Sequence, residues 1–341
     1  LREFSEEQRK KFSSLGESLI AISEYYFRDN RLFELYILIQ YLKDNFNDQK
    51  RQLYRTDLEN NHLRNINVIN RVFDDFKPNI VFHAAALKHV PLVEQNPTEA
   101  ILTNILGTKN VANAAKNSSC KIMVLISSDK AVYPSSIMGQ TKRIAESYCQ
   151  SLALSEITKA SNTNFIIVRF GNVLGSTGSV VPLFQRQIAL GGPVTVTHPD
   201  ATRYFMTSKE AVRLVLHATT IQEDGAHANR IFILDMGEPI KIQDLARQLI
   251  RMEGLVPDKD IKINFTGLRK GEKIHESLFY KEEILMPTKI AGIKEAKLFV
   301  PDLYEIDKNV ESLKKLSDAG NTNQAIKLLN NMVDDYTKPQ K

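Results

Sequence analysis

The fold is decided by the stretch Ile80-Val81-Phe82-His83-Ala84-Ala85-Ala86-Leu87-Lys88-His89. It opens with three apolar residues, and such a run without polar alternation is typical of a strand buried on both faces of a parallel sheet. The three alanines that follow would let a ligand approach the backbone closely. Because open α/β sheets bind ligands beyond the carboxyl ends of their strands, the stretch predicts both a buried strand and the edge of a binding crevice.

Further short apolar runs occur at residues 122–126, 165–168 and 231–234, and helical patterns separate them. After the first strand, Asn96-Pro97 supplies a cap and a helix-starting proline. The residues expected on one face of that helix are Ile101, Ile105, Thr108, Ala112 and Ala115. Strands that alternate with helices in this way favour right-handed βαβ units. We predict an α/β fold of the doubly wound, Rossmann-type class, with a parallel sheet and helices on both faces.

Two regions differ in composition from this pattern. Residues 175–199 are richer in Gly, Pro and Thr, and the part after Met236 changes to amphipathic helices with charged loops. We therefore predict a core formed by residues 1–174 and 205–237. Residues 175–204 and 238–341 are expected to form a smaller C-terminal lobe.

The 341 residues are 43% hydrophobic, which is enough to bury a substantial core. No apolar run approaches the roughly 18 to 20 residues of a membrane helix, and the first residues lack a signal peptide's apolar stretch, so a cytoplasmic location is expected. The net charge of +5 is scattered, which argues against nucleic-acid binding and suits a small anionic ligand. Two distant cysteines, Cys120 and Cys149, and histidines without paired spacing support neither a disulfide framework nor a metal site.

Polar residues follow the second and third predicted strands. Ser127-Ser128-Asp129-Lys130 comes after the run at 122–126, and Phe170-Gly171-Asn172 comes after the run at 165–168. The carboxyl ends of parallel strands lie at one edge of the sheet. A hydroxyl, a carboxylate, an ammonium group and a carboxamide should therefore reach one crevice.

Several separate segments resemble, in the same order, those of the nucleotide-sugar 4,6-dehydratases of polysaccharide biosynthesis, a branch of the extended short-chain dehydrogenase/reductase superfamily. The resemblance extends from about Asp57 to about Leu278. The matching segments are 83–91 (HAAALKHVP), 128–132 (SDKAV), 138–143 (MGQTKR), 169–175 (RFGNVLG), 202–206 (TRYFM) and 268–273 (LRKGEK).

By this resemblance the core binds NAD or NADP, and the lobe binds a UDP-sugar, typically UDP-N-acetylglucosamine. In the family's reaction a hydride leaves C4 for the nicotinamide, the C5 proton and the C6 hydroxyl are eliminated, and the hydride returns to C6. The resemblance also implies a homo-oligomer. Some relatives carry membrane-spanning segments ahead of the catalytic part, of which this chain could be the soluble portion.

Catalytic roles follow from the same resemblance. Lys130 matches the base that takes the C5 proton, and burial and nearby cations would help by lowering its pKa. Asp129 matches the acid that assists departure of the C6 oxygen, and Ser128 matches a hydroxyl that polarises C4. Most of the superfamily has a tyrosine four residues before Lys142, but Met138 stands here, as in one branch of the dehydratases. Because methionine takes no proton, deprotonation at C4 would involve Asp129, Lys142 or water.

Five further residues match positions that bind the substrate. Asn172 and Arg269 would hold the sugar and its diphosphate, the arginine because its planar fork can engage two phosphate oxygens. Glu272 would bond a ribose hydroxyl, and Lys88 would lie near the sugar. Arg203 is either a further diphosphate contact or a brace of the lobe.

Cofactor contacts are expected from Ala84, Ala85 and Ala86, which line the crevice after the first strand. Asn104 is expected near the nicotinamide. Lys142 would bind the nicotinamide ribose.

The N-terminal part departs from the family pattern. Gly16 lies in a segment that resembles only the tail of the glycine-rich loop whose backbone amides receive the pyrophosphate. Asp29 resembles the acidic residue that meets the adenosine ribose, although nearby arginines leave NADP open beside NAD. Asp57, followed by Leu58, fits the adenine contact. Three explanations for the missing glycine-rich loop remain open: the loop is remodelled, the sequence omits part of the enzyme, or the sequence lacks its disordered residues.

Two other functions remain open. A C4 or C5 epimerase on the same fold would share both sites, but the Asp129-Lys130 pair favours elimination. A nucleotide-sugar-binding pseudoenzyme that regulates or scaffolds a glycan assembly complex is suggested by the missing glycine loop.

Overall fold

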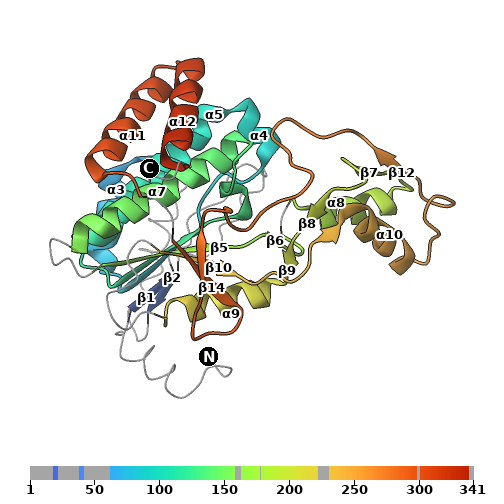
Figure 1. Ribbon diagram of the computed structural model, residues 1–341, viewed down its shortest axis with the longest axis horizontal. Helices are drawn as coiled ribbons and strands as arrows, with labels where there is room; N and C mark the ends of the chain where they lie inside the picture. The colour runs from blue at the N-terminus through green and yellow to red at the C-terminus, as the bar shows by residue number, and fades with distance from the viewer. Residues whose placement is uncertain are drawn as a thin grey trace.

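The computed structural model describes residues 18–21, 38–41, 62–157, 163–176, 178–221, 230–297 and 300–337. One large sheet lies at the centre of the molecule, and a smaller lobe projects from one side of it (Figure 1). The strand order of this sheet is β13-β14-β10-β5-β4-β3-β1-β2.

The central strands are those that the apolar runs predict. They are β3 (Ile80–His83), β4 (Ile122–Ile126), β5 (Asn164–Arg169) and β10 (Arg230–Leu234). All pair in parallel with their neighbours among these four, and nearly every residue of β3, β4 and β5 is buried. The predicted doubly wound α/β class is therefore confirmed.

Both edges of the sheet carry antiparallel strands. At one edge β1 (Ser18–Ala21) pairs in parallel with β3, and β2 (Leu38–Tyr41) pairs antiparallel with β1. At the other edge β14 (Ile293–Lys297) pairs antiparallel with β10, and β13 (Ile284–Pro287) pairs antiparallel with β14.

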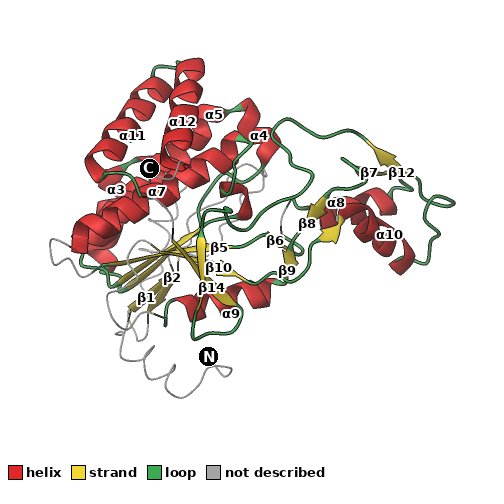
Figure 2. Cartoon of the chain, viewed as in Figure 1, coloured by secondary structure: helices red, strands yellow, loops and turns green. Residues whose placement is uncertain are grey.

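Most of the described helices lie on one face of the sheet (Figure 2). On this side are η1 (His62–Arg64), α3 (Ile66–Phe76), α4 (Val90–Gln95), α5 (Pro97–Ala100), the π-helical segment η2 (Ile101–Leu106), α6 (Gly107–Asn117), α7 (Ile137–Ile157), α11 (Leu303–Asp318) and α12 (Thr322–Thr337). The helix predicted after Asn96 begins at Pro97, and the five residues expected on its inner face are all buried. The opposite face packs against α9 (Ser208–Ala218), which a capping box at Thr207 starts.

The lobe has a core of its own, in which Phe184, Val194 and Ala246 pack together. Its elements, with those at its junction to the sheet, are β6 (Asn172–Val173), α8 (Val180–Ala189), β7 (Val194–Val196), β8 (Thr202–Arg203), β9 (Phe205–Met206), β11 (Ile240–Lys241), α10 (Ile242–Met252) and β12 (Ile263–Phe265). The structure corrects the predicted assignment of residues 238–341 to this lobe. Strands β13 and β14 extend the main sheet, and α11 and α12 pack against α7, because their apolar faces match that helix and not the lobe.

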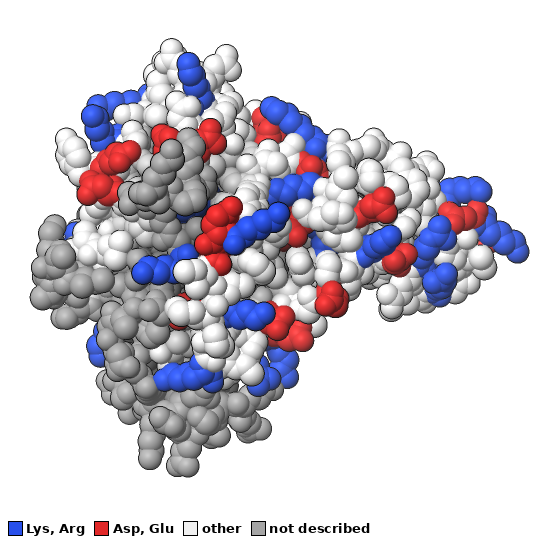
Figure 3. All heavy atoms as spheres, in the orientation of Figure 1, with Lys and Arg blue, Asp and Glu red and all other residues white. Residues whose placement is uncertain are grey.

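Basic and acidic side chains are interspersed over the face shown in Figure 3. Within the residues that the structure describes, no helix is both long and apolar enough to cross a membrane.

Candidate active site

A cavity of about 430 Å³ lies at the carboxyl edge of the sheet, between the core and the lobe. A second chamber of about 350 Å³ adjoins it and shares Lys130, Arg203 and Arg269 with it. The residues from the sequence-based prediction that line the larger chamber are Ala84, Ala86, Lys88, Ser128, Lys130, Met138, Lys142, Asn172, Arg203, Arg269 and Glu272. The strand ends thus meet as the parallel sheet requires.

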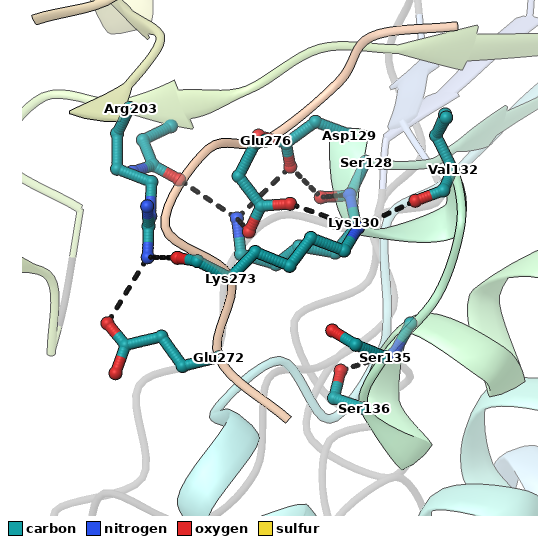
Figure 4. A network of polar contacts seen from close by, with 12 residues as sticks. Ser128, Asp129, Lys130, Val132, Ser135, Ser136, Arg203, Glu272, Lys273 and Glu276 are labelled. Carbon is teal, nitrogen blue, oxygen red and sulfur yellow. Dashed lines mark hydrogen bonds and ion pairs between the residues drawn. The ribbon is translucent and has the colours of Figure 1, made fainter. Parts of the chain in front are cut away.

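Lys130 lies at the centre of a polar network (Figure 4). Lys130 belongs to the short helix η3 (Asp129–Ala131), which begins shortly after the end of β4. Lys130 Nζ donates to Asp129 Oδ1 at 3.1 Å and to Asn172 Oδ1 at 3.3 Å, and lies 3.5 Å from Glu276 Oε1. Ser128 Oγ donates to the same Asp129 oxygen at 2.7 Å. Asp129 is fully buried, so the predicted hydroxyl, carboxylate, ammonium group and carboxamide form one cluster.

The expectation that Lys130 has a lowered pKa is wrong. Burial acts in the expected direction, but Asp129 and Glu276 outweigh it and raise the pKa of Lys130 above its ordinary value. Arg203 is the nearby cation that opposes them. The lysine is therefore held as an ammonium ion between carboxylates.

Lys142 lines the same cavity from the second turn of α7, in a different environment. Its Nζ donates to the carbonyl oxygen of Ile126 at 3.0 Å, and 8% of the residue is exposed. Burial lowers the pKa of Lys142 to about 8, against the weaker opposing effect of Glu146. Met138, one helical turn earlier, is buried beside it in the cavity lining.

Arg203 lines both chambers of the cavity and bonds to the segment that lies beside it. Its guanidinium donates to three backbone carbonyl oxygens, those of Thr202, Lys273 and Ile274, and lies 3.2 Å from Glu272 Oε1. Glu272 also accepts from Thr197 Oγ1 and from the backbone amide of Arg269. These bonds fasten segment 269–274 across the cavity mouth.

Asn104 lies beneath the cavity and is absent from its described lining. Its side chain accepts from Leu87 N at 2.7 Å, and donates to Leu87 O and to Thr141 Oγ1, both at 3.0 Å. Asn104 thereby joins the loop after β3 to the start of α7. Ala85 is likewise buried, whereas Ala84 and Ala86 face the cavity.

His83 ends β3 below the cavity. Burial, with Lys142 nearby, lowers the pKa of His83 to about 3, so its imidazole is neutral. Its Nε2 lies 2.9 Å from Thr108 Oγ1, and its buried Nδ1 has no partner among the described residues. Four predicted cofactor contacts, Gly16, Asp29, Asp57 and Leu58, lie outside the described residues.

A family model described as "Polysaccharide biosynthesis protein" matches residues 16–298. The chain belongs to this family. Capsular polysaccharide biosynthesis protein CapD of Staphylococcus aureus is 53% identical over 251 residues, which are 74% of this chain and 40% of that protein. UDP-glucose 4-epimerase of Rickettsia bellii is 37% identical over 255 residues, which are 75% of this chain and 71% of that protein. The chain thus spans less than half the length of CapD.

Solved structures agree with the fold of this polysaccharide biosynthesis protein. Pen from Bacillus thuringiensis matches with a TM-score of 0.62 and 33% identity, covering 75% of this chain and 79% of that chain. DesIV, a dTDP-glucose 4,6-dehydratase from Streptomyces venezuelae solved with NAD bound, matches with a TM-score of 0.54 and 18% identity, covering 64% and 69% of the two chains. At that identity the likeness to DesIV establishes the Rossmann-type fold that they share.

Two site residues of this family member were missed by the sequence reasoning. Glu276 contacts Lys130 and lies 3.3 Å from Lys273 Nζ, and Tyr280 OH donates to the carbonyl oxygen of Ala131 at 2.8 Å. Both come from the segment that follows the lobe and returns to the sheet. Their nearness to residues 268–273 was the one available signal, since neither stands at a strand end.

Proposed function

We propose that this chain is an NAD-dependent nucleotide-sugar 4,6-dehydratase that converts UDP-N-acetylglucosamine to its 4-keto-6-deoxy derivative for surface polysaccharide synthesis. The observation that supports this most directly is the Asp129–Lys130 pair: Lys130 lines a cavity large enough for a ligand at the carboxyl edge of the sheet, and the fully buried Asp129 bonds it at 3.1 Å. An elimination needs an acid and a base side by side, and this pair supplies both.

The described residues fit the nicotinamide end of a dinucleotide. Ala84 and Ala86 leave the backbone after β3 accessible from the cavity, and Lys142 projects into it from α7. The orphan Nδ1 of His83 is a buried polar atom next to this region. We propose that the nicotinamide end of the cofactor is held by Ala84, Ala86 and Lys142. When bound, NAD would accept a hydride from C4 of the sugar and return it to C6.

The ion pair of Asp129 and Lys130 needs one proton transfer to become catalytic. If a proton moves from Lys130 Nζ to Asp129 Oδ1 along their 3.1 Å hydrogen bond, the lysine becomes a neutral amine and the aspartate a carboxylic acid. The amine then takes the C5 proton, the C5 electron pair forms a double bond to C6, and the C6 oxygen leaves as water with the proton of Asp129. This step restores the ion pair. When the hydride is returned to C6, C5 takes up a proton that the Lys130 ammonium group can give back, and the proton released from the C4 hydroxyl balances this loss before the next turnover.

Lys142 suits a different proton transfer. Its pKa of about 8 leaves part of the population neutral near pH 7, and Met138 cannot serve as a base. Of the three candidates for deprotonation of the C4 hydroxyl, Lys142 is thus the one supported by its environment.

The lobe side of the cavity supplies groups for the rest of the substrate. Arg269 and Lys88 carry positive charge toward a diphosphate and a sugar, Asn172 offers an amide beside Lys130, and Glu272 offers a carboxylate to a ribose hydroxyl. Because Arg203 is occupied by backbone carbonyl groups, we assign it to fixing the lobe.

A 4-epimerase is the second candidate, because the Rickettsia epimerase is similar over most of both chains. An epimerase returns its product without loss of water. The Asp129–Lys130 pair has no necessary part in such a reaction, and this favours the dehydratase.

The test is incubation of the purified chain with UDP-N-acetylglucosamine and NAD, followed by mass spectrometry of the sugar nucleotide. A product lighter by one water supports the dehydratase. An isomer of unchanged mass that separates chromatographically from the substrate would support the epimerase instead. Binding of the UDP-sugar without any product would indicate a binding protein.

A further inference from the structure

A closed ring of buried hydrogen bonds lies directly behind the loop that carries Asp129 and Lys130. We call it the loop clamp. Its members are Ser127, Glu146, Arg169, Glu283, Tyr280 and Ala131. The clamp begins at the residue two positions before Asp129 and ends at the residue after Lys130.

The first half of the clamp joins β4, α7 and β5. Ser127 Oγ donates to Glu146 Oε1 at 2.6 Å. Arg169 engages both oxygens of Glu146, each at 2.7 Å. Glu146 and Arg169 are fully buried, and although burial alone would raise the pKa of Glu146, Arg169 and Arg143 hold it below its ordinary value. The carboxylate is therefore a permanent acceptor for Ser127.

The second half belongs to the segment that follows the lobe. Arg169 Nη1 donates to Glu283 Oε1 at 2.6 Å, and Glu283 Oε2 accepts from Tyr280 N at 2.8 Å. Tyr280 OH then donates to Ala131 O at 2.8 Å. The guanidinium groups of Arg143 and Arg169 lie 5.9 and 5.7 Å from the centre of the Tyr280 ring. The ring of Tyr280 is thus fixed, and its hydroxyl is aimed at the catalytic loop.

Packing alone does not require this arrangement. Buried ion pairs of this kind are often no more stabilising than apolar side chains of the same volume, whereas they fix one geometry well. Hydrogen bonds connect the charged groups of Glu146, Arg169 and Glu283 to the loop of Asp129 and Lys130 along two paths. One path runs through Ser127 and the other through Tyr280. From the C-terminal segment, the hydroxyl of Tyr280 closes the ring at Ala131, and Lys273 Nζ donates separately to Val132 O at 2.7 Å.

We propose that Tyr280 is a positioning residue for the Asp129–Lys130 pair, acting through Ala131 and held in place by Glu283 and Arg169. It touches neither substrate nor cofactor. Its hydroxyl keeps the turn from residue 128 to residue 132 in the one conformation that leaves Lys130 Nζ bonded to Asp129 Oδ1. The catalytic part of this inference rests on the proposed dehydratase function, and the structural part does not.

Tyr280→Phe is the decisive variant, because it keeps the ring between the arginines and removes only the bond to Ala131. Tyr148→Phe is the matched control: Tyr148 is equally buried, and its hydroxyl accepts from Asn113 and bonds Asp307 away from the loop. Hydrogen–deuterium exchange of the peptide that covers residues 127–133 is measured in both variants and in the unaltered chain. Four amides of this peptide make backbone hydrogen bonds: those of Ala131 and Val132 lie within the turn, and those of Ser127 and Asp129 donate to Val168 O and Phe170 O.

We expect faster exchange of this peptide in Tyr280→Phe and unchanged exchange there in Tyr148→Phe. In the dehydration assay, kcat of Tyr280→Phe should fall by about 10-fold or more with KM within about twofold of the unaltered chain, because a misplaced catalytic pair affects chemistry and not binding. Thermal melts of both variants establish that they fold.

Exchange at residues 127–133 that stays as in the unaltered chain would overturn the proposal. So would faster exchange at those residues with an unchanged kcat, or an equal loss of kcat in Tyr148→Phe. If the unaltered chain does not dehydrate the sugar, the proposed function fails, but the exchange measurement still decides whether Tyr280 fixes the loop.

Discussion

Two lysines face the same cavity, Lys142 buried and Lys130 partly exposed, and their pKa values are shifted in opposite directions. Lys130, on the loop after β4, lies between Asp129 and Glu276, which raise its pKa. Among the described residues, Lys142 on α7 has one hydrogen-bond partner, the carbonyl oxygen of Ile126, and burial lowers the pKa of Lys142 to about 8. The comparison teaches that nearby carboxylates can outweigh the effect of burial on the pKa of a lysine, whereas burial decides where no carboxylate is bonded to it.

The difference suggests a division of labour. Lys130 shares its proton with Asp129 and can exchange the roles of acid and base with it. Lys142 can lose its proton to solvent near neutral pH, because that proton does not have to pass to a neighbouring carboxylate. Variants that remove one lysine or change its partners break or sharpen this comparison.

The largest effect is expected from Lys130→Met. The variant keeps the length of the side chain but has no group to take the C5 proton, so turnover should fall by about 10³-fold while the UDP-sugar still binds. Mass spectrometry of the product and calorimetric titration with the UDP-sugar measure the two quantities. Lys121→Met, at an exposed lysine just before β4, is the control and should be unaffected. Near-normal turnover of Lys130→Met would remove Lys130 from the mechanism.

The sequence predicted those parts of this site that depend on parallel strands. Buried parallel strands need continuous apolar runs, so β3, β4, β5 and β10 could be located. Because their carboxyl ends share an edge, Asp129, Lys130 and Asn172 could be placed together before any contact was known.

The surroundings of Lys130 could not be predicted in the same way. Glu276 and Tyr280 reach the cavity because the chain returns from the lobe to the sheet, and no local pattern encodes that path. The expected direction of the pKa of Lys130 was wrong because it weighed burial and cations but not the adjacent Asp129, and because Glu276 could not be foreseen. The amphipathic patterns of α11 and α12 likewise indicated helices, but not that they pack on α7.

A smaller effect is expected on the free energy of unfolding. Replacing Lys142 should stabilise the chain, whereas replacing Lys109 should destabilise it. Lys142 carries a pKa of about 8 in the folded chain and 10.5 as an ordinary lysine, a difference worth about 3 kcal/mol against folding below pH 8. Lys142→Met removes this cost and loses about 1 kcal/mol with the bond to Ile126 O. The variant should therefore be more stable by about 2 kcal/mol at pH 7.

The pH dependence of that gain follows from the same values. Between pH 8 and 10.5 the folded chain binds fewer protons at Lys142 than the unfolded chain, so the stability of the unaltered chain rises with pH there. The advantage of Lys142→Met should shrink over this range, vanish within it, and become a deficit of about 1 kcal/mol above it, where only the lost hydrogen bond to Ile126 O remains. Urea denaturation at several pH values measures it. Lys109→Met is the control: this buried lysine is paired with Asp307 and Glu311, so its loss should destabilise the chain. A Lys142→Met variant that is less stable at pH 7 would contradict the argument.

The smallest effect tests the partner of Lys130 alone. Glu276 raises the pKa of Lys130, so Glu276→Gln should lower that pKa and ease the proton transfer to Asp129. The limb of the kcat profile on which activity falls at high pH, where the Asp129–Lys130 pair loses its proton to solvent, should then move to lower pH by about one pH unit. Glu295→Gln, at a buried glutamate of β14, is the control and should leave the profile in place. An unmoved limb in Glu276→Gln would mean that Asp129 alone holds the proton on Lys130, and the contrast with Lys142 would then rest on one carboxylate instead of two.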